Sequence, residues 1–81
     1  MDSEATHLYD LEEFDTALTE SILNEVTEAL REKGYHPIKQ ITGYLMSGDP
    51  GYISSYKDAR KKISSIDRSK IIEFLLGKVL D

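Results

Sequence analysis

The residues best suited to chemistry in this chain are two histidines, a glycine-rich turn and a run of basic side chains. His7 and His36 stand apart from each other and from any acidic residues with ligand or triad spacing, so we expect surface or capping histidines. The chain has no cysteine, no Gly-x-x-x-x-Gly-Lys phosphate loop and no His-Glu-x-x-His motif. We therefore predict that the protein is not an enzyme and holds no metal and no organic cofactor.

The segment from Ser47 to Gly51 has the composition of a phosphate-binding turn, because glycines and helix N-termini bind anions. Asp49 would repel a phosphate placed there, which favours a structural turn. In such a turn Asp49 accepts hydrogen bonds from the backbone N–H groups beyond it, and Pro50 fixes its own φ.

Basic side chains gather between residues 57 and 70, namely Lys57, Arg60, Lys61, Lys62, Arg68 and Lys70. They could contact nucleic acid as part of a helix-turn-helix. They could equally pair with acidic residues, since residues 1–33 hold ten acids and two bases within a chain of net charge -5. This charge balance favours pairing with the acidic first helix, within one subunit or across a dimer.

Glycines and prolines divide the chain at helix-length intervals. An amphipathic helix is predicted from an N-cap at Asp15 to residue 33, followed by a short, mostly buried helix from Pro37 to Gly48. A third helix is expected over residues 57–64 and a fourth over residues 68–80. Gly43, inside the second helix, suggests a close approach by another backbone. Tyrosines at positions 35, 44, 52 and 56 suit core and interface packing better than a base-stacking platform.

These elements predict an all-α fold, a compact bundle of about four short-to-medium helices. Residues 15–81 form the single domain, and residues 1–14, which lack a sustained period, form a mobile N-terminal arm. The apolar residues of the last helix cover more than half its circumference, more than one small core uses. We therefore expect an intertwined or closely packed homodimer whose interface uses the last helix and residues 37–45.

Targeting signals are not evident. No apolar run approaches the roughly 20 residues of a membrane span, and the N-terminus lacks the basic flank of a signal peptide. A cytoplasmic protein without membrane insertion is expected.

A set of residues in the centre of the chain carries a specific resemblance: Gly34, Tyr35, Pro37, Gln40, Gly43, Tyr44, Gly48, Asp49, Pro50 and Tyr52. Together with the following Lys-Asp-Ala-Arg at 57–60, this pattern resembles the IreB family of small bacterial regulatory phosphoproteins. The resemblance implies a helical homodimer in the cytoplasm of a Gram-positive bacterium. It also implies a substrate of a membrane-bound PASTA-domain Ser/Thr kinase and its phosphatase, in signalling of cell-wall stress or antibiotic tolerance.

The same resemblance implies the phosphorylation sites. The family's acceptors are threonines ahead of the first helix, and ungapped alignment places them at Thr6 and Ser3, with serine in place of threonine at the second position. The expected docking surface for a phosphorylated arm is basic: Lys57, Arg60, Lys61 and Lys62. The alternative function is a small nucleic-acid-associated regulator that uses the basic third helix.

Overall fold

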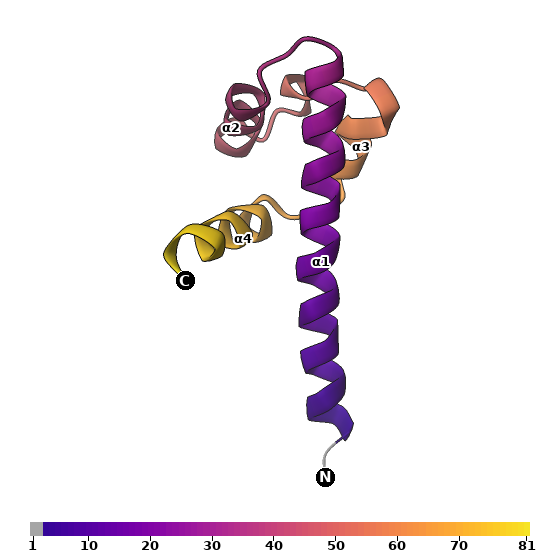
Figure 1. Cartoon of the computed structure of the whole chain (residues 1–81), viewed down its shortest axis with the longest axis vertical. Helices are drawn as coiled ribbons and strands as arrows, with labels where there is room; N and C mark the ends of the chain where they lie inside the picture. The colour runs from indigo at the N-terminus through magenta and orange to yellow at the C-terminus, as the bar shows by residue number, and fades with distance from the viewer. Residues whose placement is uncertain (1–2) are drawn as a thin grey trace.

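One long helix, α1 (Ser3–Glu32), organises the fold, and the other elements join it towards its C-terminal end (Figure 1). This computed structural model describes the backbone of residues 3–81 and the side chains of residues 15–81. After α1 come α2 (Pro37–Ser47), η1 (Pro50–Tyr52), η2 (Tyr56–Asp58), α3 (Ala59–Ser64) and α4 (Arg68–Leu80). No strand occurs among residues 3–81, so the predicted all-α class with four α-helices is confirmed.

Both ends of α1 can be compared with the predicted boundaries. The helix does not begin at a cap at Asp15, as predicted, but runs back to Ser3. Acidic residues are frequent in this early stretch and suit the positive end of the helix dipole. At the other end the prediction is confirmed, because Gly34 is left-handed with φ of 83°. The N–H of Tyr35 donates to the carbonyl of Leu30 at 2.9 Å, as in a Schellman cap.

The core lies around the C-terminal half of α1. Its fully buried side chains come from α1, the turn after η1, α3 and α4: Val26, Leu30, Ile53, Ile63 and Ile71. Burying each such side chain contributes about 1.5–3 kcal/mol relative to leaving it exposed. The core therefore fixes α3 and the start of α4 against α1. The N-terminal part of α1 stands clear of the other helices, and α4 extends sideways from the middle of α1 (Figure 1).

The boundaries of α2 were predicted correctly, but its burial was not. Pro37 occupies the first turn and Gly48 ends the helix in a left-handed conformation, φ 76°. His36 is the N-cap, and its Nδ1 accepts from the N–H of Lys39 at 3.4 Å, so the expectation of a capping histidine is confirmed. Only Tyr44 of α2 is buried, and Ile38 is 73% exposed. One side of α2 is therefore uncovered in the single chain.

The third predicted helix is shorter than expected. Lys57 and Asp58 have φ of 53° and 60°, the left-handed region that a right-handed helix excludes, so α3 begins only at Ala59. The preceding turn is held by backbone bonds, from Asp58 N–H to the Ser55 carbonyl and from Arg60 N–H to the Ser54 carbonyl, both 3.0 Å. Two adjacent strained residues thus shape the surface of the chain before α3.

Candidate functional site

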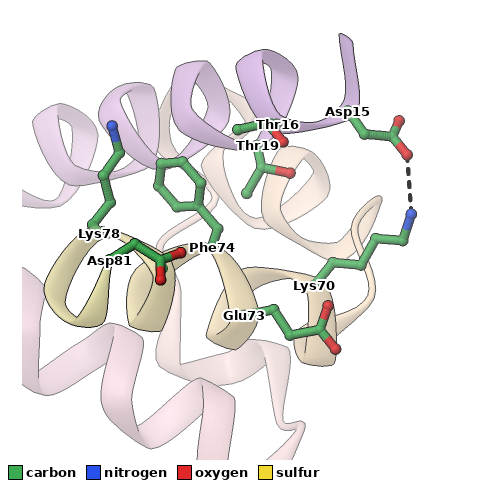
Figure 2. A pocket seen from close by; sticks show the side chains of 9 residues that line it. Asp15, Thr16, Thr19, Lys70, Glu73, Phe74, Lys78 and Asp81 are labelled. Atoms are coloured by element: carbon green, nitrogen blue, oxygen red, sulfur yellow. Dashed lines mark hydrogen bonds and ion pairs between the residues drawn. The ribbon is translucent and has the colours of Figure 1, made fainter. Parts of the chain in front are cut away.

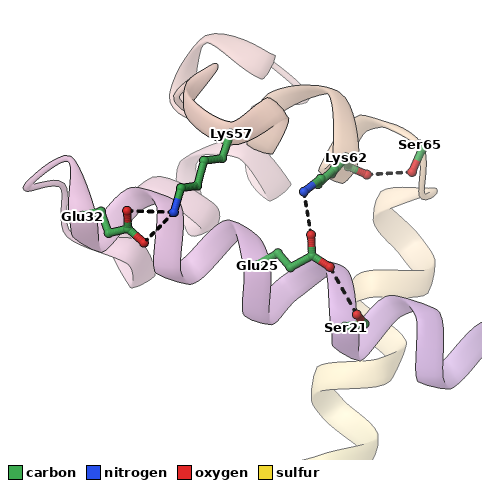
Figure 3. A network of polar contacts seen from close by, with 6 residues as sticks. All are labelled: Ser21, Glu25, Glu32, Lys57, Lys62 and Ser65. Atoms are coloured by element: carbon green, nitrogen blue, oxygen red, sulfur yellow. Dashed lines mark hydrogen bonds and ion pairs between the residues drawn. The ribbon is translucent and has the colours of Figure 1, made fainter.

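The acidic side of α1 and the basic side chains around α3 form a polar network (Figure 3). Lys62 Nζ lies 2.6 Å from Glu25 Oε1, and Lys57 Nζ lies 3.1 Å from Glu32 Oε1. The hydroxyl of Tyr56 also donates to Glu32, at 3.0 Å. Two turns of α1 are therefore tied to the segment that contains η2 and α3.

These contacts alter the acid–base properties of both partners. The hydrogen bond from Lys62 lowers the pKa of Glu25, and the hydrogen bonds from Lys57 and then Tyr56 lower the pKa of Glu32. The hydrogen bond to Glu32 raises the pKa of Lys57 in turn. All four charged groups are solvent-accessible, so the pairs fix geometry more than they add stability.

A third ion pair joins α4 to α1 at the edge of a hollow (Figure 2). Lys70 Nζ donates to Asp15 Oδ2 at 3.0 Å, and this hydrogen bond raises the pKa of Lys70. The hollow measures about 450 Å³ and contains side chains of both charge signs. Phe74 lies between the two helices, with the Lys78 ammonium 5.4 Å from its ring centroid. The hollow thus lies at the contact between α4 and α1.

The basic residues predicted as one cluster fall into two groups. Lys57 and Lys62 point to α1 and pair with its carboxylates, which confirms the predicted pairing within a subunit. Arg60 donates from Nε to the carbonyl of Ile53 at 2.9 Å. Lys61 is exposed and has no hydrogen-bond or ion-pair partner among residues 15–81. Lys57, Lys62 and Lys70 are engaged with acids, so three of the six cations predicted for the alternative of nucleic-acid binding are neutralised.

Four residues of the central sequence pattern build the corner between α2 and η1, namely Gln40, Gly43, Asp49 and Tyr52. Gln40 Nε2 donates to the carbonyl of Tyr52 at 2.9 Å. A Cβ on Gly43 would lie 2.5 Å from the Tyr52 ring, so the close approach predicted at Gly43 comes from a ring rather than a backbone. Asp49 Oδ1 accepts from the N–H of Gly51 at 2.8 Å, in agreement with the predicted structural turn. The remaining members of the pattern set helix ends and packing, namely Gly34, Tyr35, Pro37, Tyr44, Gly48 and Pro50.

The corner is also linked to α4. The guanidinium of Arg68 donates to the carbonyl of Leu45 at 2.9 Å and lies against Gly48, where a Cβ would be 2.9 Å from its Cζ. Together with Lys70, this contact sets the direction in which α4 leaves the body. The pairing of Arg68 with a helix C-terminus was not visible in the sequence, because it joins residues far apart in the chain.

An apolar stripe runs along the outer side of α4. Five exposed side chains recur at the three- and four-residue steps of one helix face: Ile72, Leu75, Leu76, Val79 and Leu80. Beside it, a groove of about 710 Å³ lies between α1, α2 and α4. Its apolar walls are formed by Leu23, Ile38, Ile41, Leu45, Phe74 and Leu75. The structure thus presents a continuous apolar surface on the two helices that were predicted to form an interface.

The predicted phosphoacceptor positions belong to α1. The backbone at Ser3 and Thr6 is helical, while their side chains, like that of His7, lie outside the described residues. At about 1.5 Å per residue, position 6 lies about 28 Å along α1 from Glu25, the partner of Lys62. Docking of a phosphorylated Thr6 on the basic residues of its own chain therefore requires the start of α1 to unwind.

Residues 15–81 offer little for metal or membrane chemistry. Within that range no three histidine or acidic side chains gather in a way that could hold a metal ion. No helix of the described chain is long and apolar enough to cross a membrane.

The family model described as IreB regulatory phosphoprotein matches residues 4–81 of the chain. The match includes the corner between α2 and η1, the engaged basic residues before and within α3, and the apolar last helix.

Proposed function

The chain belongs to the IreB family of regulatory phosphoproteins, and from this we propose that it is a non-catalytic cytoplasmic regulator switched by a Ser/Thr kinase. The kinase is of the membrane-bound PASTA-domain type, with an opposing phosphatase, and the signal is cell-wall stress or antibiotic exposure. The observation that carries the proposal is the family match over nearly the whole chain.

Thr6 is the main acceptor in this proposal, and Ser3 is secondary. The part of α1 before Asp15 stands clear of the other helices (Figure 1). A kinase cleft needs an extended, accessible segment, and chain ends are where local unwinding costs least. Phosphate adds about -1.5 to -2 charges, a large change in an already acidic segment.

A regulatory role without catalysis is supported by how the chemistry-bearing side chains are used. His36 caps α2 and Asp49 stabilises a turn. Glu25 and Glu32 are held by lysines. A general base or nucleophile needs a partner group and an open site for the reacting atom, and these side chains are occupied by structural contacts.

The functional unit in this proposal is a homodimer. The stripe on α4 is apolar yet exposed, and Val79 and Leu80 are 78% and 74% accessible in the single chain. Adjacent to the stripe, the groove between α1, α2 and α4 provides a matching apolar surface. A second copy that covers both surfaces in a twofold arrangement removes this apolar area from water.

The test of the acceptor assignment is labelling by the purified kinase domain, followed by intact-mass and peptide analysis. Wild-type protein should gain phosphate mainly on the peptide that contains Thr6. Thr6→Ala should lose most of the label, and the double variant with Ser3→Ala should lose the rest. Equal labelling of the double variant and the wild type would overturn the assignment. Ser21→Ala serves as the matched control, because Ser21 is an exposed residue of α1 whose hydroxyl donates to Glu25, and this variant should be labelled like wild type.

A further inference from the structure

A second hollow lies on the side of α3 that faces away from α1. It measures about 330 Å³ and lies between η1 and α3. Its lining residues are Pro50, Ser55, Asp58, Arg60, Lys61 and Ser64. Two basic residues, two serines and Asp58 therefore line a small hollow whose surface is formed mainly by apolar atoms.

The two cations of this hollow differ from those that face α1. Lys57 and Lys62 are neutralised by carboxylates at 3.1 and 2.6 Å. Lys61 has no such partner among the described side chains, and Arg60 uses only Nε, which leaves its terminal nitrogens without a protein acceptor in that part of the chain. Arginine with free terminal N–H groups and a free lysine are the groups that bind phosphoryl oxygens best.

The shape of the hollow is fixed before any ligand arrives. Arg60 is anchored to the carbonyl of the buried Ile53, and the strained turn at Lys57 and Asp58 is closed by backbone hydrogen bonds. Ser54 Oγ also accepts from the N–H of Tyr56 at 3.1 Å. A preformed site avoids the entropy cost of ordering its donors.

We propose that this hollow binds the phosphoryl group of phosphorylated Thr6 from a second copy of the chain. This rests on the proposed function, in which Thr6 is the acceptor. Arg60 and Lys61 supply charge-assisted hydrogen bonds, and the hydroxyls of Ser55 and Ser64 donate to the remaining oxygens. The phosphoryl group is assigned to a second copy because, while α1 stays helical from Ser3, position 6 lies about 28 Å along the helix from the level of Glu25 and α3. It reaches the hollow of its own chain only if the start of α1 unwinds.

Asp58 is an acidic residue of the same hollow and affects the expected affinity for phosphate. Its carboxylate also lines the hollow and opposes a bound phosphate, so it tunes affinity downwards and favours a reversible contact. Asparagine removes this charge and tolerates the left-handed φ of 60° at that position. Asp58→Asn should therefore strengthen binding without disturbing the turn.

The experiment is a titration of ¹⁵N-labelled full-length protein with a synthetic peptide of residues 1–14 phosphorylated at Thr6. Amide shifts are expected at residues 55, 58, 60, 61 and 64, with no comparable shifts from the unphosphorylated peptide. Loss of one screened charge contact changes affinity by about fivefold. Lys61→Gln should therefore weaken binding about fivefold and Asp58→Asn should strengthen it about fivefold. Lys62→Gln, a cation on the α1 side, is the matched control and should leave affinity unchanged.

Three results would overturn the proposal: no shifts around the hollow, shifts confined to Lys57 and Lys62, or inorganic phosphate binding as tightly as the phosphopeptide, which indicates an adventitious anion only. Because the phosphopeptide is synthetic, failure here is independent of whether the kinase labels Thr6.

The second copy is tested by mixing unlabelled phosphorylated protein with ¹⁵N-labelled protein carrying Ser3→Ala and Thr6→Ala. Shifts in the labelled copy support docking between copies. The absence of shifts in the labelled copy contradicts it.

Discussion

Leu76→Ala tests the proposed dimer, because this side chain occupies the middle of the exposed stripe on α4. Leu76 is 50% exposed in the single chain, so the fold should tolerate its truncation. The substitution removes three carbons, and burial of each contributes about 0.8 kcal/mol. Because Leu76 is half exposed in the single chain, about half of this burial energy arises on association. The loss is about 1.2 kcal/mol per copy and about 2.4 kcal/mol per dimer, which weakens the dimer Kd roughly 50-fold.

Sedimentation equilibrium over a wide concentration range measures this shift directly. Met46→Ala is the matched control, since Met46 is 83% exposed on α2 and does not line the groove. Its Kd should stay within about twofold of wild type, because a scattered exposed side chain contributes little to association. Equal Kd values for Leu76→Ala and Met46→Ala would refute the interface assignment. A wild-type protein that is monomeric at about tens of micromolar would refute it as well.

Two further predictions concern the corner and the polar network. Gly48→Ala should lower the free energy of unfolding by about 2–3 kcal/mol, because the residue needs a positive φ and its Cβ would displace the Arg68 guanidinium. Gly34→Ala is the control, because Gly34 also has a positive φ but no heavy atom lies within 4 Å of an added Cβ, and it should lower the free energy of unfolding by about 1–2 kcal/mol. Equal losses for the two variants in urea unfolding would exclude a role for Arg68. Lys62→Gln should raise the pKa of Glu25, measured by ¹³C NMR, while leaving Glu32 unchanged. Since the pKa of Glu25 is lowered in the folded chain, its contribution to stability is present above the ordinary carboxyl range and is lost as the pH falls through the lowered value.

The sequence predicted the parts of the fold that local chemistry decides. Pro37, Gly34 and Gly48 fix helix ends through their own φ preferences, and the structure places all three as expected. The start of α1 was predicted wrongly because residues 1–14 lack a sustained apolar period, whereas the helix there continues from a long, well-anchored C-terminal half. Whether residues 1–14 form a mobile arm stays a prediction.

Features that depend on tertiary contacts were harder to predict from the sequence. The left-handed turn at Lys57 and Asp58 carries no glycine to signal it, so the third helix was predicted to start too early. The charge balance predicted that the acidic α1 pairs with the basic segment. It did not predict which carboxylates pair with Lys62 and Lys57. The separation of Arg60 and Lys61 from these paired lysines arises only once α3 packs along α1.

In the proposed function, phosphorylation of the segment before Asp15 changes what this protein binds. Its most direct test is quantitative capture of cellular proteins on immobilised wild-type and Thr6→Ala protein, each with and without prior kinase treatment. We expect at least one protein whose recovery on wild type changes severalfold with phosphate, an effect about as large as a phosphate contact provides. Its recovery on Thr6→Ala should not change. Identical recovery on phosphorylated and unphosphorylated wild type would contradict it.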